Sequence, residues 1–163
     1  YVAFFVQIMI QSVGDGSQPL ISVYRGAGNA DAVRRLRNTN YAVAIVLGVA
    51  GLGLMFAISD LIPPLFGASE AAAPIIVYAL PVFSICYIFY GFTHTTTSYF
   101  YAVDDARCSN ALVVAEAVIV CVVVFVMGRL FQVDGIWFAP TVLQIILAII
   151  AGTLLYRRHR ARK

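Results

Sequence analysis

The chain consists of long, nearly uncharged apolar runs separated by short breaks that contain charges, proline or glycine. A helix needs about 20 mostly apolar residues to cross the hydrocarbon core of a bilayer, which is about 30 Å thick. Hydrophobic residues make up 61% of the chain and charged residues 12%, whereas soluble domains have roughly 45–50% and about 25%. Because the excess is concentrated in runs of spanning length, the sequence predicts an integral membrane protein and excludes a soluble globule or a disordered chain.

Five such runs predict an all-α fold, a polytopic membrane helix bundle that forms a single membrane domain over residues 1–163. The expected spans are residues 1–24, 41–62, 74–103, 111–127 and 136–156, followed by a basic tail at 157–163. The Pro63-Pro64 pair is expected to stop the second helix, and Pro81 to kink the third. The fourth and fifth runs are rich in β-branched residues. They are longer than the roughly 10 residues of a membrane strand and lack its alternating polarity, which favours helices.

The basic residues are distributed unequally between the two sides of the predicted membrane. All of them except Arg129 lie between the first and second spans, between the third and fourth, or in the tail. Cytoplasmic loops carry an excess of Lys and Arg, so the C-terminus is expected in the cytoplasm, with the plasma membrane as the expected location. A short helix is expected on this surface over residues 31–37. Orientation or anionic lipid suffices to explain the basic clusters, and no nucleic-acid partner is expected.

Three ionisable residues, Asp15, His94 and Glu116, fall inside predicted spans. At 1.5 Å per residue, each lies about 13 to 15 Å from the nearest cytoplasmic charge, which is near the membrane midplane. Such residues usually face the interior of the bundle, and several at one depth are typical of a transporter's binding site. Alternatively, His94 is a neutral, hydrogen-bonded imidazole, and Glu116 is a neutral acid or the partner of a base in a missing segment.

Polar side chains form helical stripes around these three groups. The stripe of the first span has spacings of four, four, three and four: Gln7, Gln11, Asp15, Gln18 and Ser22. A second stripe lies on the third span, and Gln144 adds a polar group in the fifth. The candidate pathway for a cation or substrate combines residues from these spans with Glu116: Asp15, Gln18, Gln11, Glu116, Tyr90, Thr93, His94, Thr97 and Gln144. The alternative is that the uncharged members only link helices, at about 0.6 kcal/mol each.

Four residues are candidate hinges: Gly14, Gly16, Pro19 and Pro81. The two glycines flank Asp15, where the helix is expected to loosen and expose backbone groups.

A metal centre or an enzyme active site is not indicated. The chain has two histidines and three scattered cysteines, without CxxC or HxxxH spacing, so a zinc site is not expected. Neither a GxSxG elbow nor a dinucleotide fingerprint is present. The sequence therefore predicts a non-enzyme without a cofactor, and the one feature that would suit a membrane enzyme is the Asp104-Asp105 pair at the membrane surface.

Three stretches resemble the multidrug and toxic compound extrusion (MATE) transporters. Residues 14–22, Gly-Asp-Gly-Ser-Gln-Pro-Leu-Ile-Ser, and 24–29, Tyr-Arg-Gly-Ala-Gly-Asn, resemble the end of the second helix of a MATE lobe. Residues 97–102, leading into the loop 104–107, are similar to the exit of the fourth helix, and residues 135–140 to the entry of the last helix.

The MATE family has twelve spans in two lobes of six. The resemblance implies that the five spans are the eighth to twelfth helices, a C-terminal lobe without its first helix. The N-terminal lobe of the same chain is then a missing partner. A fragment is also expected because Tyr1 opens directly into an apolar run.

The resemblance implies a secondary antiporter that exports a small organic substrate, cationic or amphipathic, in exchange for H⁺ or Na⁺. Some MATE branches place an acidic ion-binding residue in the tenth helix. The corresponding span, 74–103, has none, so coupling to protons is expected rather than to sodium. Two alternatives are a flippase of the same superfamily for a lipid-linked precursor, which would need a basic cavity, and a scaffold subunit that does not transport.

Overall fold

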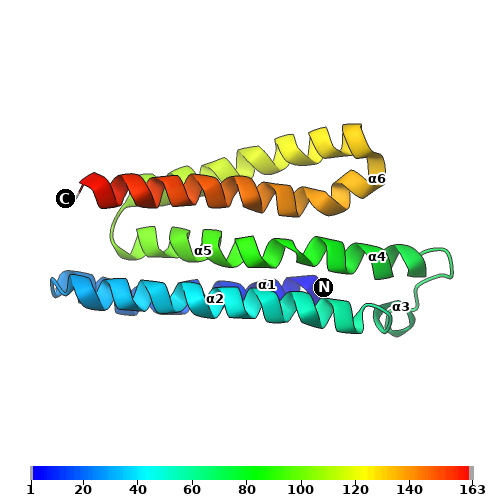
Figure 1. Cartoon of the computed structure of the whole chain (residues 1–163), viewed down its shortest axis with the longest axis horizontal. Coiled ribbons are helices and arrows are strands. Elements are labelled where there is room, and N and C mark those ends of the chain that lie inside the picture. The colour runs from blue at the N-terminus through cyan, green and yellow to red at the C-terminus, as the bar shows by residue number, and fades with distance from the viewer. Residues whose placement is uncertain (1, 162–163) are drawn as a thin grey trace.

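The structure, a computed structural model, describes residues 2–161, and within this range helices are the only regular secondary structure. Figure 1 shows an elongated bundle in which the chain runs back and forth along one axis. The helices are α1 (Val2–Gly26), α2 (Ala30–Ile58), α3 (Ile62–Leu65), α4 (Ala73–Ser84), α5 (Cys86–Ala102) and α6 (Ala106–Ala161). The predicted all-α polytopic bundle is confirmed.

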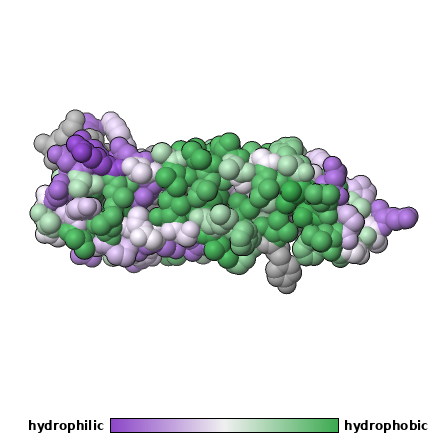
Figure 2. Space-filling model, turned by 90° about the horizontal axis from the view of Figure 1, so that it is seen from below, coloured by the Kyte–Doolittle hydropathy of each residue, from purple (hydrophilic) through white to green (hydrophobic). Residues whose placement is uncertain are grey.

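Three segments of the bundle are long and apolar enough to cross a membrane: Ala30–Ile58, Ala73–Ala102 and Ala106–Arg158. Helix α1 was also expected to span; it has 25 residues but carries the polar stripe, and it is not among these three. In Figure 2 hydrophobic residues cover the middle of the visible face and hydrophilic residues gather at both ends. An apolar belt between polar ends is the surface that a bilayer requires.

Helix α2 begins at Ala30, well before the expected start near residue 41, and the short helix expected over 31–37 is its first part. The Asn29 side chain caps it by accepting a hydrogen bond from the Ala32 N–H at 3.0 Å, and Asp31 lies in the first turn, where an acidic group is favourable. The helix ends at Ile58, before the Pro63-Pro64 pair. These prolines lie in the first turn of α3, where a missing N–H costs nothing.

The third predicted span is interrupted at Ile85, between α4 and α5. Pro81 lies one turn earlier; it cannot donate a backbone hydrogen bond, and its ring crowds the carbonyl four residues before it. The missing hydrogen bond is the one to the Val77 carbonyl, on the opposite side of Pro81 from Ile85, so the interruption at Ile85 is a separate feature and the kink at Pro81 stays a prediction.

Helix α6 folds back on itself, as Figure 1 shows, so that its two limbs run antiparallel. The reversal is at Gln132, where φ is 53° and ψ is −131°. The loop expected between the fourth and fifth spans, at 128–135, is therefore helical up to a tight bend. Gly135 lies so close to the Met127 carbonyl that a Cβ atom has no room.

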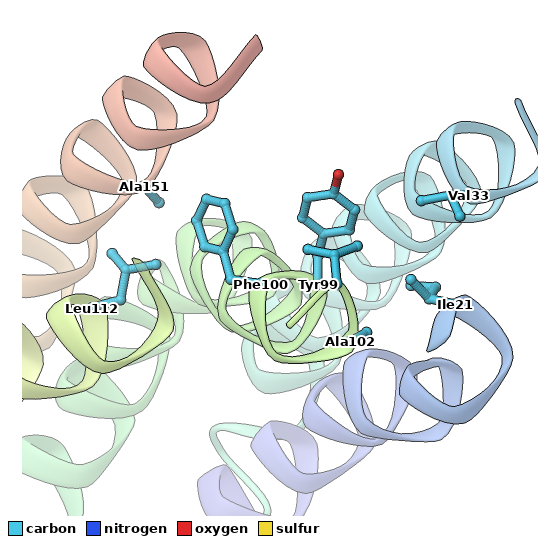
Figure 3. Packing of buried hydrophobic residues seen from close by; sticks show 8 residues of the cluster. Ile21, Val33, Tyr99, Phe100, Ala102, Leu112 and Ala151 are labelled. Atoms are coloured by element: carbon cyan, nitrogen blue, oxygen red, sulfur yellow. The ribbon is translucent and has the colours of Figure 1, made fainter. Parts of the chain in front are cut away.

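Helix α5 lies at the centre of the bundle and packs against α1, α2 and α6. In Figure 3 Phe100 of α5 points toward Leu112 and Ala151, which belong to the two limbs of α6, while Ile21 and Val33 lie on the other side. Phe100 is completely buried. This placement gives α5 access to every other long helix, so its polar face can meet theirs.

The connections rich in arginine gather at one end of the bundle. The α1–α2 turn, the α5–α6 connection and the C-terminal end of α6 share this end, shown on the left in Figure 1. Arg158 of α6 binds Asp105 there, with 3.1 Å between Nη1 and Oδ2. Its guanidinium also lies 5.5 Å from the centre of the Phe100 ring. Arg129 lies at the opposite end, near the bend of α6.

Candidate functional site: a polar cavity between α1, α5 and α6

A cavity of about 200 Å³ opens between α1, α5 and the two limbs of α6. Three apolar residues line it, Leu112, Val113 and Leu147, and the remaining lining residues are Asp15, Gln18, Tyr90, Thr93, His94, Thr97, Ser98, Tyr101 and Glu116. Except for Gln11 and Gln144, every candidate pathway residue predicted from the sequence lines this cavity. The structure thus brings the three ionisable groups of three different spans together.

Asp15 is the centre of the hydrogen-bond network on the α1 side. Its Oδ1 accepts hydrogen bonds from Ser98 Oγ and Gln18 Nε2, both at 3.1 Å, and lies 3.0 Å from His94 Nε2. No bond to Oδ2 is found among the residues that the structure describes. The Asp15 side chain is 45% exposed and that of His94 20%, so one carboxylate oxygen is held from α5 and the other is open.

Gly14 makes the close approach of α1 to α5 possible. A Cβ atom at this position would lie 2.8 Å from Ser98 Oγ and 3.2 Å from His94 Cδ2. Helix α1 continues without interruption through Gly14, Gly16 and Pro19, so the expected loosening around Asp15 is not observed here. The close contact positions the Asp15 carboxylate against α5 without unwinding the helix.

Tyr90 forms an aromatic wall next to His94. The two rings stack with 5.6 Å between their centres and 28° between their planes. The Tyr90 hydroxyl donates to Gln11 Oε1 at 3.4 Å, which links Gln11 to the cavity although it does not line it. The stacking limits rotation of the imidazole and keeps Nε2 directed at Asp15.

Glu116 supplies a second carboxylate from the first limb of α6. Its Oε1 accepts a hydrogen bond from Gln144 Nε2 at 3.4 Å, and Gln144 Oε1 accepts one from Thr93 Oγ1 at 2.6 Å. Gln144 and Thr93 are only 5% and 7% exposed, so the amide is fixed from both sides. Gln144 therefore connects α5 to Glu116 through the second limb of α6.

Ser98 is the polar lining residue that belongs to no stripe predicted from the sequence. It lies four residues after His94 and one after Thr97, on the same face of α5. Serine is common in membrane helices as a link between helices, and its spacing from His94 was the available signal.

The lining carries two carboxylates and one imidazole, and neither Lys nor Arg lines the cavity. Such a lining favours cations. Among residues 2–161, no group of three or more His, Cys, Asp and Glu side chains is arranged to hold a metal ion. The volume is below the roughly 300–1,000 Å³ of sites for drug-sized ligands, so in this conformation the cavity suits protons, water or a small cation.

The MatE family model matches residues 1–127 of the chain. The match covers α1 to α5 and most of the first limb of α6, and therefore Asp15, His94 and Glu116. Gln144 and the stretch 135–140 lie outside it. No curated protein and no solved structure gives a significant match.

Proposed function

Because this chain belongs to the MatE family of membrane transporters, we propose that it acts in an antiporter that exports small organic cations in exchange for protons. The observation that carries this proposal is the contact between Asp15 and His94, at 3.0 Å, in the wall of a cavity between helices. Acidic and basic groups are rare at membrane depth because they are costly there, and they mark ion pathways when they occur.

Protons fit this site better than sodium ions as the coupling ion. The Asp15 Oδ1 atom is surrounded by hydrogen-bond donors from Ser98 and Gln18, which stabilise a carboxylate without a metal. Hard cations instead require several oxygen ligands around them. A proton can move between His94 Nε2 and Asp15 Oδ1 within the existing contact, whereas a sodium ion would have to displace the donors.

Glu116 provides a second acceptor across the same cavity. A cation that binds Asp15 would lie beside a cavity with two carboxylates in its wall, and its charge would favour release of a proton from them. Rocking of the helices about a midplane site would then expose it to either side of the membrane in turn. We place this transport in the plasma membrane, with the arginine-rich end of the bundle in the cytoplasm.

The two alternative functions have less support. A flippase for a precursor bearing pyrophosphate would need basic groups in its cavity, and this cavity is lined by acidic ones. A scaffold subunit would fill the space between its polar stripes, whereas Asp15, His94 and Glu116 line a cavity between helices of this chain.

Transport by the complete protein in proteoliposomes tests the proposal. With a pH gradient imposed, we expect uptake of an organic cation coupled to proton movement, measured with a fluorescent cation and an internal pH dye. Asp15→Asn and Glu116→Gln should each slow uptake about tenfold or more, because each removes a charge whose hydrogen bonds are worth about 1.5–3 kcal/mol.

Asp60→Asn is the matched control, since Asp60 is exposed and lies outside the cavity. Unchanged uptake in both cavity variants, or uptake driven by a sodium gradient alone, would contradict proton antiport through this site.

A further inference from the structure

A second depression lies on the surface of α1 and shares Asp15 with the cavity. It measures about 380 Å³ and is lined by Ile8, Gln11, Ser12, Asp15 and Gly16. These residues follow one another at spacings of three, one, three and one, which places them on one face of the helix. Because one face of a single helix lines it, the depression is more open than the cavity and can admit a group too large for the cavity.

Gly16 creates the space beside Asp15. A Cβ atom at Gly16 would have no heavy atom within 4 Å, whereas one at Gly14 would collide with Ser98. Glycine in the interior of a helix costs about 1 kcal/mol relative to alanine. Contacts with other helices explain this cost at Gly14, but nothing packs against Gly16 in this structure.

The charge of the depression indicates what could occupy it. Asp15 is its single charged lining residue, and the bonds from α5 and Gln18 go to Oδ1. Oδ2 is left for a group that approaches from the α1 surface. Ile8 adds an apolar contact, and the Gln11 and Ser12 side chains add polar ones. A carboxylate beside an apolar contact is complementary to an organic cation, whose charge is attached to an apolar body.

We propose that this depression is the subsite for the body of the organic cation, that the cationic group binds Asp15 Oδ2, and that Gly16 limits the size of the cation. The proposal rests on the proposed antiport and adds a place for the substrate outside the cavity. The cavity, at about 200 Å³, then serves the proton, and Asp15 belongs to both sites through its two oxygens.

Substitution of Gly16 tests the subsite. Gly16→Leu fills the depression, and Gly53→Leu is the matched control because a Cβ atom at Gly53 also meets nothing within 4 Å. Both changes raise helix propensity equally. Uptake of tetramethylammonium, a small cation, and of tetraphenylphosphonium, a large one, is measured in proteoliposomes of the complete protein.

We expect Gly16→Leu to slow tetraphenylphosphonium uptake about tenfold or more, because steric mismatch of this kind typically changes discrimination roughly 10- to 200-fold. Tetramethylammonium uptake should stay within about twofold, and Gly53→Leu should alter neither. Gly16→Ala should fall between Gly16→Leu and the unmodified protein for the large cation.

Unchanged uptake of both cations in Gly16→Leu would overturn the subsite, and so would equal loss of both. A lower unfolding temperature without a change in selectivity would also overturn it, because it would mean that another helix covers Gly16. The Asp15→Asn variant separates the subsite from the antiport. If Asp15→Asn loses uptake, the proposed antiport stands even where the Gly16 results overturn the subsite. If Asp15→Asn leaves uptake unchanged, the antiport itself is contradicted.

Discussion

At the scale of single residues, the two glycines beside Asp15 have different structural roles. Gly14 faces α5 and lets the helices approach, whereas Gly16 faces open space. Both are helical, so the difference comes from their neighbours and not from backbone conformation. The carboxylate between them is held by α5 on one side and exposed on the other.

Alanine at these two positions should therefore have opposite effects on stability. Gly14→Ala places a methyl group 2.8 Å from Ser98 Oγ, and overpacking of this kind costs about 1–3 kcal/mol. Gly16→Ala meets no neighbour and gains up to about 1 kcal/mol of helix propensity. Thermal unfolding in detergent should show a lower transition temperature for Gly14→Ala and an equal or higher one for Gly16→Ala. Identical shifts would contradict the close approach of α1 to α5 at Gly14.

Ser98 should act as a positioning residue for Asp15. Ser98→Ala removes one of the hydrogen bonds to Oδ1, which is worth roughly 1.5–3 kcal/mol when the acceptor is charged. We expect uptake to slow about tenfold or more, because Asp15 loses one of the hydrogen bonds that hold its carboxylate in place. Ser59→Ala is the control, since among the described residues the Ser59 hydroxyl bonds only to the Phe56 carbonyl at the end of its own helix, and Ser59 lines neither the cavity nor the depression. Equal uptake in both variants would show that Ser98 only packs.

At the scale of helices, the faces of the site were predictable and the ends of the helices were less so. The polar stripes follow from the 3.6-residue period, which is a property of the sequence alone. They predict that Asp15, His94 and Glu116 face the interior of the bundle, and these three residues line one cavity. Helix α2 starts at Ala30, where Asn29 caps it. The expected start near Tyr41 was too late, because it was taken from the apolar run alone and charged residues at a membrane surface can also be helical.

The bend of α6 falls inside the break predicted between the fourth and fifth spans, but its tight geometry at Gln132 could not be predicted from local sequence. Gln132 adopts a positive φ that non-glycine residues rarely occupy. The antiparallel packing of the two limbs holds it there, which is a tertiary effect. Ser98 was missed for a related reason: its partner Asp15 lies on another helix, and only the approach at Gly14 brings the two together.

The bend should depend on Gly135 more than on Gln132. A side chain at position 135 would collide with the Met127 carbonyl and the Phe131 side chain, so Gly135→Val forces the limbs of α6 apart. Because Gln144 and Glu116 lie on different limbs, the variant should lose the bond between them as well as about 1–3 kcal/mol of stability. Gly152→Val is the control, since nothing lies within 4 Å of its Cβ position. Equal thermal stability of the two variants would contradict a tight reversal at this point.

At the scale of the whole molecule, the arginine-rich end defines a direction for the bundle. The α1–α2 turn is followed by Arg34, and the connection between α3 and α4 at the opposite end carries Glu70. Loops rich in Arg face the cytoplasm, which would place Glu70 outside and the Asp15 carboxylate roughly midway between the two surfaces. The proposed export would then require that a cation reach this depth from the arginine-rich side.

Labelling of single cysteines in whole cells tests this direction. The chain has three cysteines, all free, at 86, 108 and 121; after their replacement by alanine, Glu70→Cys and Arg34→Cys introduce one exposed thiol at each end. A maleimide that cannot cross membranes should label Glu70→Cys in intact cells and Arg34→Cys only after permeabilisation. The reverse pattern would mean that the arginine-rich end faces the outside. Cations that enter at that end would then be imported and not exported. Labelling of both thiols in intact cells would mean that the apolar belt in Figure 2 does not seal the two ends from each other.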